Sequence, residues 1–127
     1  MDQLISKSET ICEPDININS KLIREDQTWL LIIDHQEKLI QKIDGNKLIT
    51  FNIKRLIDTC ILLNVEIAIS EQNPSKLGAT TKEILPLKEL FKFEKMEFSC
   101  LKNRTFKKHL KLNSIRNIII CGIESHI

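Results

Sequence analysis

The chain has 127 residues and a formal net charge of +2, which fits one compact domain and offers no electrostatic case for a dedicated polyanion binder. Hydrophobic residues make up 42% of the chain and charged residues 28%, so it can bury a core of ordinary size. Three Gly and three Pro exclude collagen-like and Pro/Gly-rich disordered chains, and one Trp, five Phe and no Tyr argue against an aromatic platform for stacking bases.

The first half of the chain predicts one strand followed by one long helix. Residues 1–20 are polar, aperiodic and interrupted by Pro14, which indicates a flexible N-terminal arm. Residues 29–33 are a short apolar run, typical of a strand buried on both faces. A turn is predicted at residues 44–46, and residues 47–63 then carry apolar side chains at helical spacing. The members of this stripe are Ile49, Ile53, Leu56, Ile57, Cys60 and Leu63.

The second half continues the alternation with shorter elements. An Asn-Pro dipeptide and a glycine mark a loop over residues 71–78. The Thr80-x-x-Glu83 spacing is a capping box, which predicts a short helix that Pro86 ends. The other predicted elements are strands at residues 65–70, 90–93 and 117–121, the last one buried, and a helix at residues 103–112 with Phe106 and Leu110 facing inward.

Strands that alternate with helices form βαβ units, and such units build a mostly parallel sheet with helices on its faces. The chain is therefore predicted to be an α/β protein with a three-layer α/β/α, Rossmann-like arrangement.

The cysteines and histidines indicate neither a metal site nor a disulfide framework. No C-x-x-C, H-x-H or His i, i+4 spacing occurs, so neither a metal nor another cofactor is expected. The first residues lack a signal peptide, and no apolar run reaches membrane-spanning length. We therefore expect a cytoplasmic protein with free thiols and no membrane partner, in which Cys60 and Cys121 fill small apolar spaces.

Charge is distributed unevenly. Residues 1–28 carry six acids and three bases, whereas residues 102–116 carry six bases and no acid. The basic run is either the solvated face of a helix or, less in keeping with the overall charge, a phosphate-facing patch. We expect the solvated face, and no nucleic-acid partner.

The residues that follow the predicted strands carry the candidate chemistry, because ligands of open α/β sheets bind beyond the carboxyl ends of the strands. Asp34 follows a run of aliphatic residues, so it is either a rigidly held general base or the N-cap of a helical turn. Lys95 follows the third strand, and it is either a surface lysine or a partner that keeps Asp34 ionised and stabilises developing negative charge.

The fourth predicted strand runs into Gly122 and a short turn, which is the layout of a nucleophile elbow. No cysteine or other evident nucleophile stands in that turn. The adjacent Ser125 and His126 do not make a triad, because neighbouring side chains diverge. His35, next to Asp34, is expected to be a pocket or core residue.

Four blocks of the sequence resemble the isochorismatase-like cysteine hydrolases, and they occur in that family's order. Residues 30–39 (LLIIDHQEKL) look like the opening strand and its aspartate. Residues 70–78 (SEQNPSKLG) are similar to the T-E-Q-x-P-x-x-L-G loop of the isochorismatase-domain-containing subgroup, and residues 93–100 (FEKMEFSC) to its lysine block. Residues 119–127 (IICGIESHI) are similar to the G-(I/V)-E-(T/S)-H-V segment.

The resemblance implies an Asp–Lys–Cys triad in which Asp34 takes the thiol proton and Lys95 is the lysine. It also implies a cis peptide at Ile123–Glu124, with an oxyanion hole built from backbone N–H groups of that turn. The implied substrate pocket includes Gln36, Gln72 and Phe98. The nicotinamidase metal ligands have no counterparts here, which fits the metal-free subgroup.

The family's cysteine would follow Ile127 and is absent from these residues, while Cys100 and Cys121 are out of register. Residues 21–127 are thus expected to be the N-terminal part of a hydrolase domain that is incomplete at its C-terminal end. We expect a hydrolase lineage acting on a small-molecule amide, C–N or vinyl-ether bond, inactive in this form. The alternative is a non-catalytic scaffold or oligomerisation protein, and exposed apolar surface makes a homo-oligomer the expected state.

Overall fold

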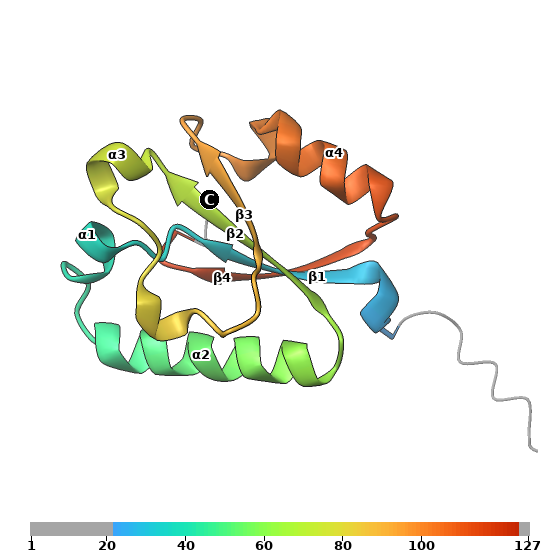
Figure 1. Cartoon of the computed structure of the whole chain (residues 1–127), viewed down its shortest axis with the longest axis horizontal. Coiled ribbons are helices and arrows are strands. Elements are labelled where there is room, and N and C mark those ends of the chain that lie inside the picture. The colour runs from blue at the N-terminus through green and yellow to red at the C-terminus, as the bar shows by residue number, and fades with distance from the viewer. Residues whose placement is uncertain (1–21, 125–127) are drawn as a thin grey trace, which may run out of the picture.

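The computed structural model describes residues 22–124, so the predicted N-terminal arm at residues 1–20 lies outside the described residues. Its four strands form one parallel sheet in the order β3-β2-β1-β4 (Figure 1). The strands are β1 (Thr28–Ile33), β2 (Glu66–Gln72), β3 (Phe91–Lys95) and β4 (Asn117–Gly122). The helices are α1 (Glu37–Ile40), α2 (Asn46–Leu62), α3 (Pro74–Leu77) and α4 (Arg104–Leu112). The predicted α/β class and parallel sheet are confirmed.

Helices cover both faces of the sheet, and this produces the three predicted layers. In Figure 1, α2 lies below the sheet and α4 above it. Strand β1 pairs with β2 on one side and β4 on the other, and all six of its residues are buried. This central position explains why residues 29–33 read as an unbroken apolar run.

Helix α2 buries its stripe against one face, although the stripe is narrower than predicted. Ile53, Ile57 and Cys60 are buried as expected, but Leu56 is 36% exposed and Leu63 is 59% exposed. At about 100° per residue, both leucines lie on the flank of the stripe, and Leu63 also follows the last helical residue. Thr50 is buried in their place.

Two predictions for residues 71–84 are corrected. Strand β2 continues to Gln72, and Pro74 starts a four-residue helix where a loop was predicted, because proline suits the first position of a helix. The capping box does not form. The Thr80 hydroxyl donates to the Glu71 carboxylate at 2.9 Å, and Thr81 rather than Thr80 precedes a 3-10 turn at Lys82–Ile84.

The later elements follow the prediction with shifted boundaries. Strand β3 ends at Lys95, so this lysine belongs to the strand rather than to the loop after it. Asn103 caps α4 by accepting a hydrogen bond from the Phe106 N–H at 2.9 Å, and Phe106 is buried while Leu110 is partly buried. Strand β4 was predicted as buried, but it is an edge strand of the described sheet and its residues are half-buried or exposed.

Candidate active site

Asp34 is the first residue after β1, and it is fully buried. Its φ of +51° places it in the left-handed region, which Asp tolerates better than most residues because of its short polar side chain. Its Oδ1 accepts the Ser70 hydroxyl at 2.7 Å, and its N–H contacts the Ser70 Oγ at 3.2 Å. The helix-cap alternative for Asp34 is wrong, since Gln36 is the N-cap of α1.

Lys95 points back over the sheet from the end of β3, and it is 2% exposed. Its Nζ donates to Asp34 Oδ2 at 2.8 Å, to Gln72 Oε1 at 2.7 Å and to the Phe98 carbonyl at 2.9 Å. All three ammonium protons therefore have acceptors. The surface-lysine alternative is wrong, and the structure brings Asp34 and Lys95 together as an ion pair.

A buried ion pair lowers the stability of the folded chain unless neighbouring groups form hydrogen bonds with both of its members. Removing two charges from water costs several kcal/mol per ion, and their attraction offsets this only with good geometry and further hydrogen bonds. The Ser70 hydroxyl, the Gln72 amide and the Phe98 carbonyl supply those bonds. The result is a preorganised charge pair at the carboxyl end of parallel strands, suited to handling a proton or a developing charge.

Gln36 and Gln72 belong to the hydrogen-bonded frame of the site. Gln36 is fully buried, its Nε2 donates to the carbonyls of Gln72 (2.9 Å) and Gly78 (2.7 Å), and its Oε1 accepts the Gln72 N–H at 2.7 Å. The Gln72 side chain donates to the Met96 carbonyl at 3.0 Å while its oxygen binds Lys95. Gln36 therefore holds the end of β2 in place and does not line an open pocket.

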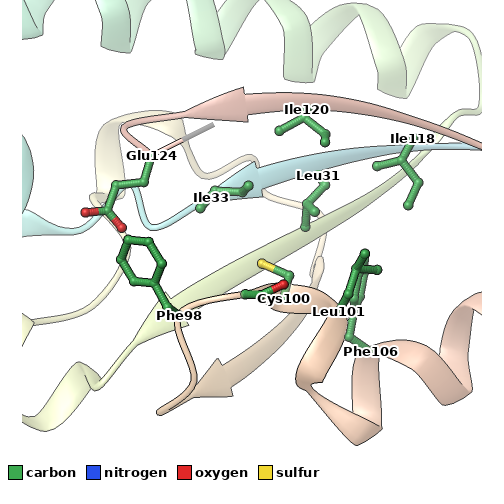
Figure 2. A pocket seen from close by; sticks show the side chains of 10 residues that line it. Leu31, Ile33, Phe98, Cys100, Leu101, Phe106, Ile118, Ile120 and Glu124 are labelled. Atoms are coloured by element: carbon green, nitrogen blue, oxygen red, sulfur yellow. The ribbon is translucent and has the colours of Figure 1, made fainter. Parts of the chain in front are cut away.

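Phe98 does line a cavity, and it is 56% exposed. The cavity has a volume of about 130 Å³. Figure 2 shows Ile118 and Ile120 on its β4 side and Cys100 and Phe106 on its α4 side. The remaining lining residues are Leu31, Ile33, Ser99, Leu101 and Glu124. The cavity is mostly apolar, and Phe98 joins it to the ion pair because its carbonyl accepts from Lys95.

The two cysteines nearest this region do not supply a ready nucleophile. Burial raises the pKa of Cys100, and the Ser70 hydroxyl and the charge of Lys95 offset this only in part. Burial raises the pKa of Cys121 to about 11. Both groups are therefore thiols rather than thiolates at neutral pH, and the thiolate is the nucleophilic form.

The turn after β4 differs from what the resemblance implies. A Cβ on Gly122 would lie 2.2 Å from the Ile33 carbonyl oxygen, so only glycine fits there. No cis peptide occurs among residues 22–124, so the expected cis bond at Ile123–Glu124 is not formed. A non-proline cis bond costs about 2.5–4 kcal/mol, and the only described contact of the Ile123 N–H is donation to the Ile33 carbonyl at 3.2 Å. Ser125 and His126 lie outside the described residues.

His35 is a core residue, one of the two roles expected for it. It is fully buried, with Nδ1 at 2.7 Å from the Thr81 hydroxyl and Nε2 at 3.2 Å from the Thr50 hydroxyl. Burial lowers the pKa of its imidazole. Over residues 22–124, no three His, Cys, Asp or Glu side chains gather as metal ligands. No helix in the same range is long and apolar enough to cross a membrane.

Sequence reasoning missed Ser70 as a site residue, although it placed Ser70 at the end of the second strand. The available signal was its spacing from Gln72: residues i and i+2 of a strand share a face. Ser70 and Gln72 therefore point to the same side of β2, and Glu71 points to the other side toward Thr80.

Comparison with known proteins shows the family and the fold of the chain. The isochorismatase domain model matches residues 28–127. Isochorismatase domain-containing protein 2 of Xenopus laevis is 31% identical over 101 residues, which are 80% of this chain and 49% of that protein. Isochorismatase family protein 2B of Dictyostelium discoideum is 29% identical over 79% of this chain and 50% of its own length. The chain thus spans about half the length of the curated relatives it matches.

Solved structures show the same fold. A MAR1 ribonuclease from Caenorhabditis elegans superposes with a TM-score of 0.72 at 30% identity, over 82% of this chain and 54% of that one. An isochorismatase from Pseudomonas putida superposes with a TM-score of 0.70 at 23% identity, over 82% of this chain and 60% of that one, and supports the fold alone. With the family model covering most of its length, the chain belongs to the isochorismatase family.

Proposed function

We propose that Asp34 and Lys95 serve thiol-dependent hydrolysis of a small-molecule amide, other C–N or vinyl-ether bond. The observation that carries this proposal is the 2.8 Å contact between two fully buried, oppositely charged side chains at the carboxyl ends of β1 and β3. Structural ion pairs also occur at such positions, but this one adjoins an apolar cavity lined by Phe98, whose carbonyl accepts from Lys95.

The proposed reaction begins with transfer of a thiol proton to the Asp34 carboxylate. The thiolate attacks the electrophilic carbon of the substrate, the bond to the leaving group breaks, and the leaving group departs with the proton that Asp34 had taken from the thiol. Water then hydrolyses the covalent intermediate and restores the thiol. Lys95 contributes its fixed positive charge, which lies 2.8 Å from Asp34 Oδ2.

The thiol of this reaction is not among the 127 residues, because none of their cysteines has the expected register. We therefore propose that these residues do not hydrolyse substrate on their own. The test is an assay of the 127-residue chain against small amides and vinyl ethers, with no turnover expected above buffer. Turnover that survives Cys100→Ala and Cys121→Ala together would contradict this.

The hydrolase proposal itself is tested on the coding sequence that follows Ile127. A cysteine codon directly in frame supports it, and a protein extended through that cysteine should turn over substrate. In the extended protein, Asp34→Asn should reduce kcat about 10²–10⁴-fold, the usual contribution of a general base. Lys54→Met on the exposed surface of α2 is the control. Equal activity of wild type and Asp34→Asn would refute the proposal.

RNA belongs in the same assay because some structural relatives are named ribonucleases or putative ribonucleases. We propose a small-molecule substrate and no nucleic-acid partner. If the extended protein cleaves RNA and Asp34→Asn abolishes that cleavage, the substrate is RNA rather than a small molecule, and Asp34 is still the general base.

A second candidate function is a non-catalytic scaffold that forms a homo-oligomer. It is favoured by β4, an edge strand of the described sheet whose Ile120 is 49% exposed. Such edges favour association. Analytical ultracentrifugation distinguishes the candidates: a discrete oligomer that Ile120→Lys dissociates supports the scaffold, and a monomer rejects it. For either function we propose a cytoplasmic setting, supported by the free thiols of Cys60, Cys100 and Cys121.

A further inference from the structure

We propose that Ser70 and Gln72 are positioning residues that fix the Asp34–Lys95 pair, a role that rests on the hydrolase function proposed above. Strand β2 lies between β1 and β3 in the sheet. Asp34 follows β1 and Lys95 ends β3, so their contact passes over the end of β2. Ser70 and Gln72 share the face of β2 over which this contact passes, and each bonds one member of the pair.

Ser70 orients the carboxylate. Its hydroxyl donates to Asp34 Oδ1 at 2.7 Å, and the same oxygen accepts the Asp34 N–H at 3.2 Å. Because a hydroxyl has a single proton, these two contacts define its orientation. The carboxylate is then held with Oδ2 toward Lys95, and rotation about the Cβ–Cγ bond would break both side-chain contacts.

Gln72 orients the ammonium. Its Oε1 accepts from Lys95 at 2.7 Å, and its Nε2 donates to the Met96 carbonyl at 3.0 Å, which opposes flipping of the amide. The backbone of Gln72 is held in turn by the Gln36 side chain, which bonds both its N–H and its carbonyl. Gln36 thus acts on Lys95 indirectly, through Gln72.

This arrangement gives the two members of the pair different roles, an electrostatic one for Lys95 and proton acceptance for Asp34. Lys95 has three ammonium protons and three acceptors, so it has no proton left for a substrate and acts through its charge. Asp34 accepts one side-chain bond at each oxygen and keeps lone pairs on both. Asp34 is therefore the member of the pair able to receive a proton.

The test uses the ammonium of Lys95 as its probe and needs no turnover. In a ¹⁵N-labelled 127-residue chain, the ¹H–¹⁵N spectrum of the lysine ammonium groups should contain one signal with slow solvent exchange, which Lys95→Met removes. Ser70→Ala and Gln72→Met should each speed that exchange at least about tenfold, because each deprives the charged pair of a hydrogen bond. Ser70→Thr and Gln72→Glu keep a hydroxyl and an acceptor, and they should restore slow exchange.

Thr50→Val is the matched control, because it removes a buried hydroxyl that contacts His35 and not the pair. It should leave the Lys95 signal unchanged. If Ser70→Ala does not fold, Ser70→Cys preserves the shape with a weaker donor and should shift exchange in the same direction. Unchanged exchange in folded Ser70 and Gln72 variants would overturn the inference. Failure of the hydrolase assay alone would not, because the spectrum is read without substrate.

Discussion

The two faces of the sheet end in different kinds of polar cluster. On the α2 face, a closed core of residues such as Ile32, Ile57 and Ile69 is fully buried, and it leads to His35 between two threonine hydroxyls. On the α4 face, the core leaves an apolar cavity beside β4, and it leads to the Asp34–Lys95 pair.

The difference separates a structural use of buried polar groups from a chemical one. The hydroxyls around His35 are suited to a neutral ring, and Thr50 and Thr81 separate that ring from a polar pocket on this face. The ion pair holds two full charges next to a cavity that reaches Phe98 and Glu124. The second cluster combines a buried ion pair with an adjoining apolar cavity, and that combination marks it as the candidate site.

The largest effect is expected from removing one charge of the α4-face cluster. Lys95→Met leaves the Asp34 carboxylate buried without its partner, which should lower the free energy of unfolding by about 3–5 kcal/mol. Urea denaturation measures this. The double variant Asp34→Asn/Lys95→Met should lose less than the sum of the single losses. A loss below about 1 kcal/mol in Lys95→Met would show that the pair is not buried as described.

The exposed pair Lys54–Asp58 on α2 is the control for this effect. It is spaced i, i+4, and both side chains are more than one-third exposed. Asp58→Asn should change the free energy of unfolding by no more than about 0.5 kcal/mol, because solvent screens such pairs.

The second prediction compares isoleucines on the two faces. Ile69→Ala on β2 removes a fully buried side chain from the α2 face and should cost about 2–5 kcal/mol. Ile120→Ala on β4 removes a half-exposed side chain at the cavity and should cost less than about 1 kcal/mol. Both residues lie in strands, so strand propensity cancels. Equal losses in urea denaturation would mean that β4 is covered, for example by a second copy in solution.

The smallest effect concerns pH and the α2-face cluster. Burial lowers the pKa of His35 in the folded chain, while the unfolded chain keeps the ordinary value of 6.5. As pH falls through 6.5, the unfolded state binds the proton first, so the free energy of unfolding decreases. The stabilisation is complete above that pH and is lost as pH falls toward the lowered value.

Urea denaturation between about pH 8 and 5.5, a range around the ordinary histidine value, measures this slope. His35→Gln should flatten it, because glutamine has no proton to gain. A slope that is unchanged in His35→Gln would assign the effect to another group.

Local sequence patterns predicted most of the elements. The apolar run of β1, most of the helical stripe of α2 and the helix at residues 103–112 are local signals, and the structure confirms them. The capping box at Thr80 is the instructive exception. The Thr80 hydroxyl donates to the distant Glu71 carboxylate, and Thr81, which makes no side-chain capping bond, precedes the 3-10 turn.

The features of the site also fall into those that local sequence predicts and those that depend on tertiary structure. By itself the sequence determined that Asp34 stands at the end of a buried strand, and that strands and helices alternate, because both follow from short-range periodicity. The tertiary structure decided that Lys95, 61 residues away, reaches Asp34 over β2, and that Ser70 and Gln72 lie beneath the contact. Strand order and register arise from packing of the whole sheet, so no local pattern could reveal which side chains meet at its carboxyl edge.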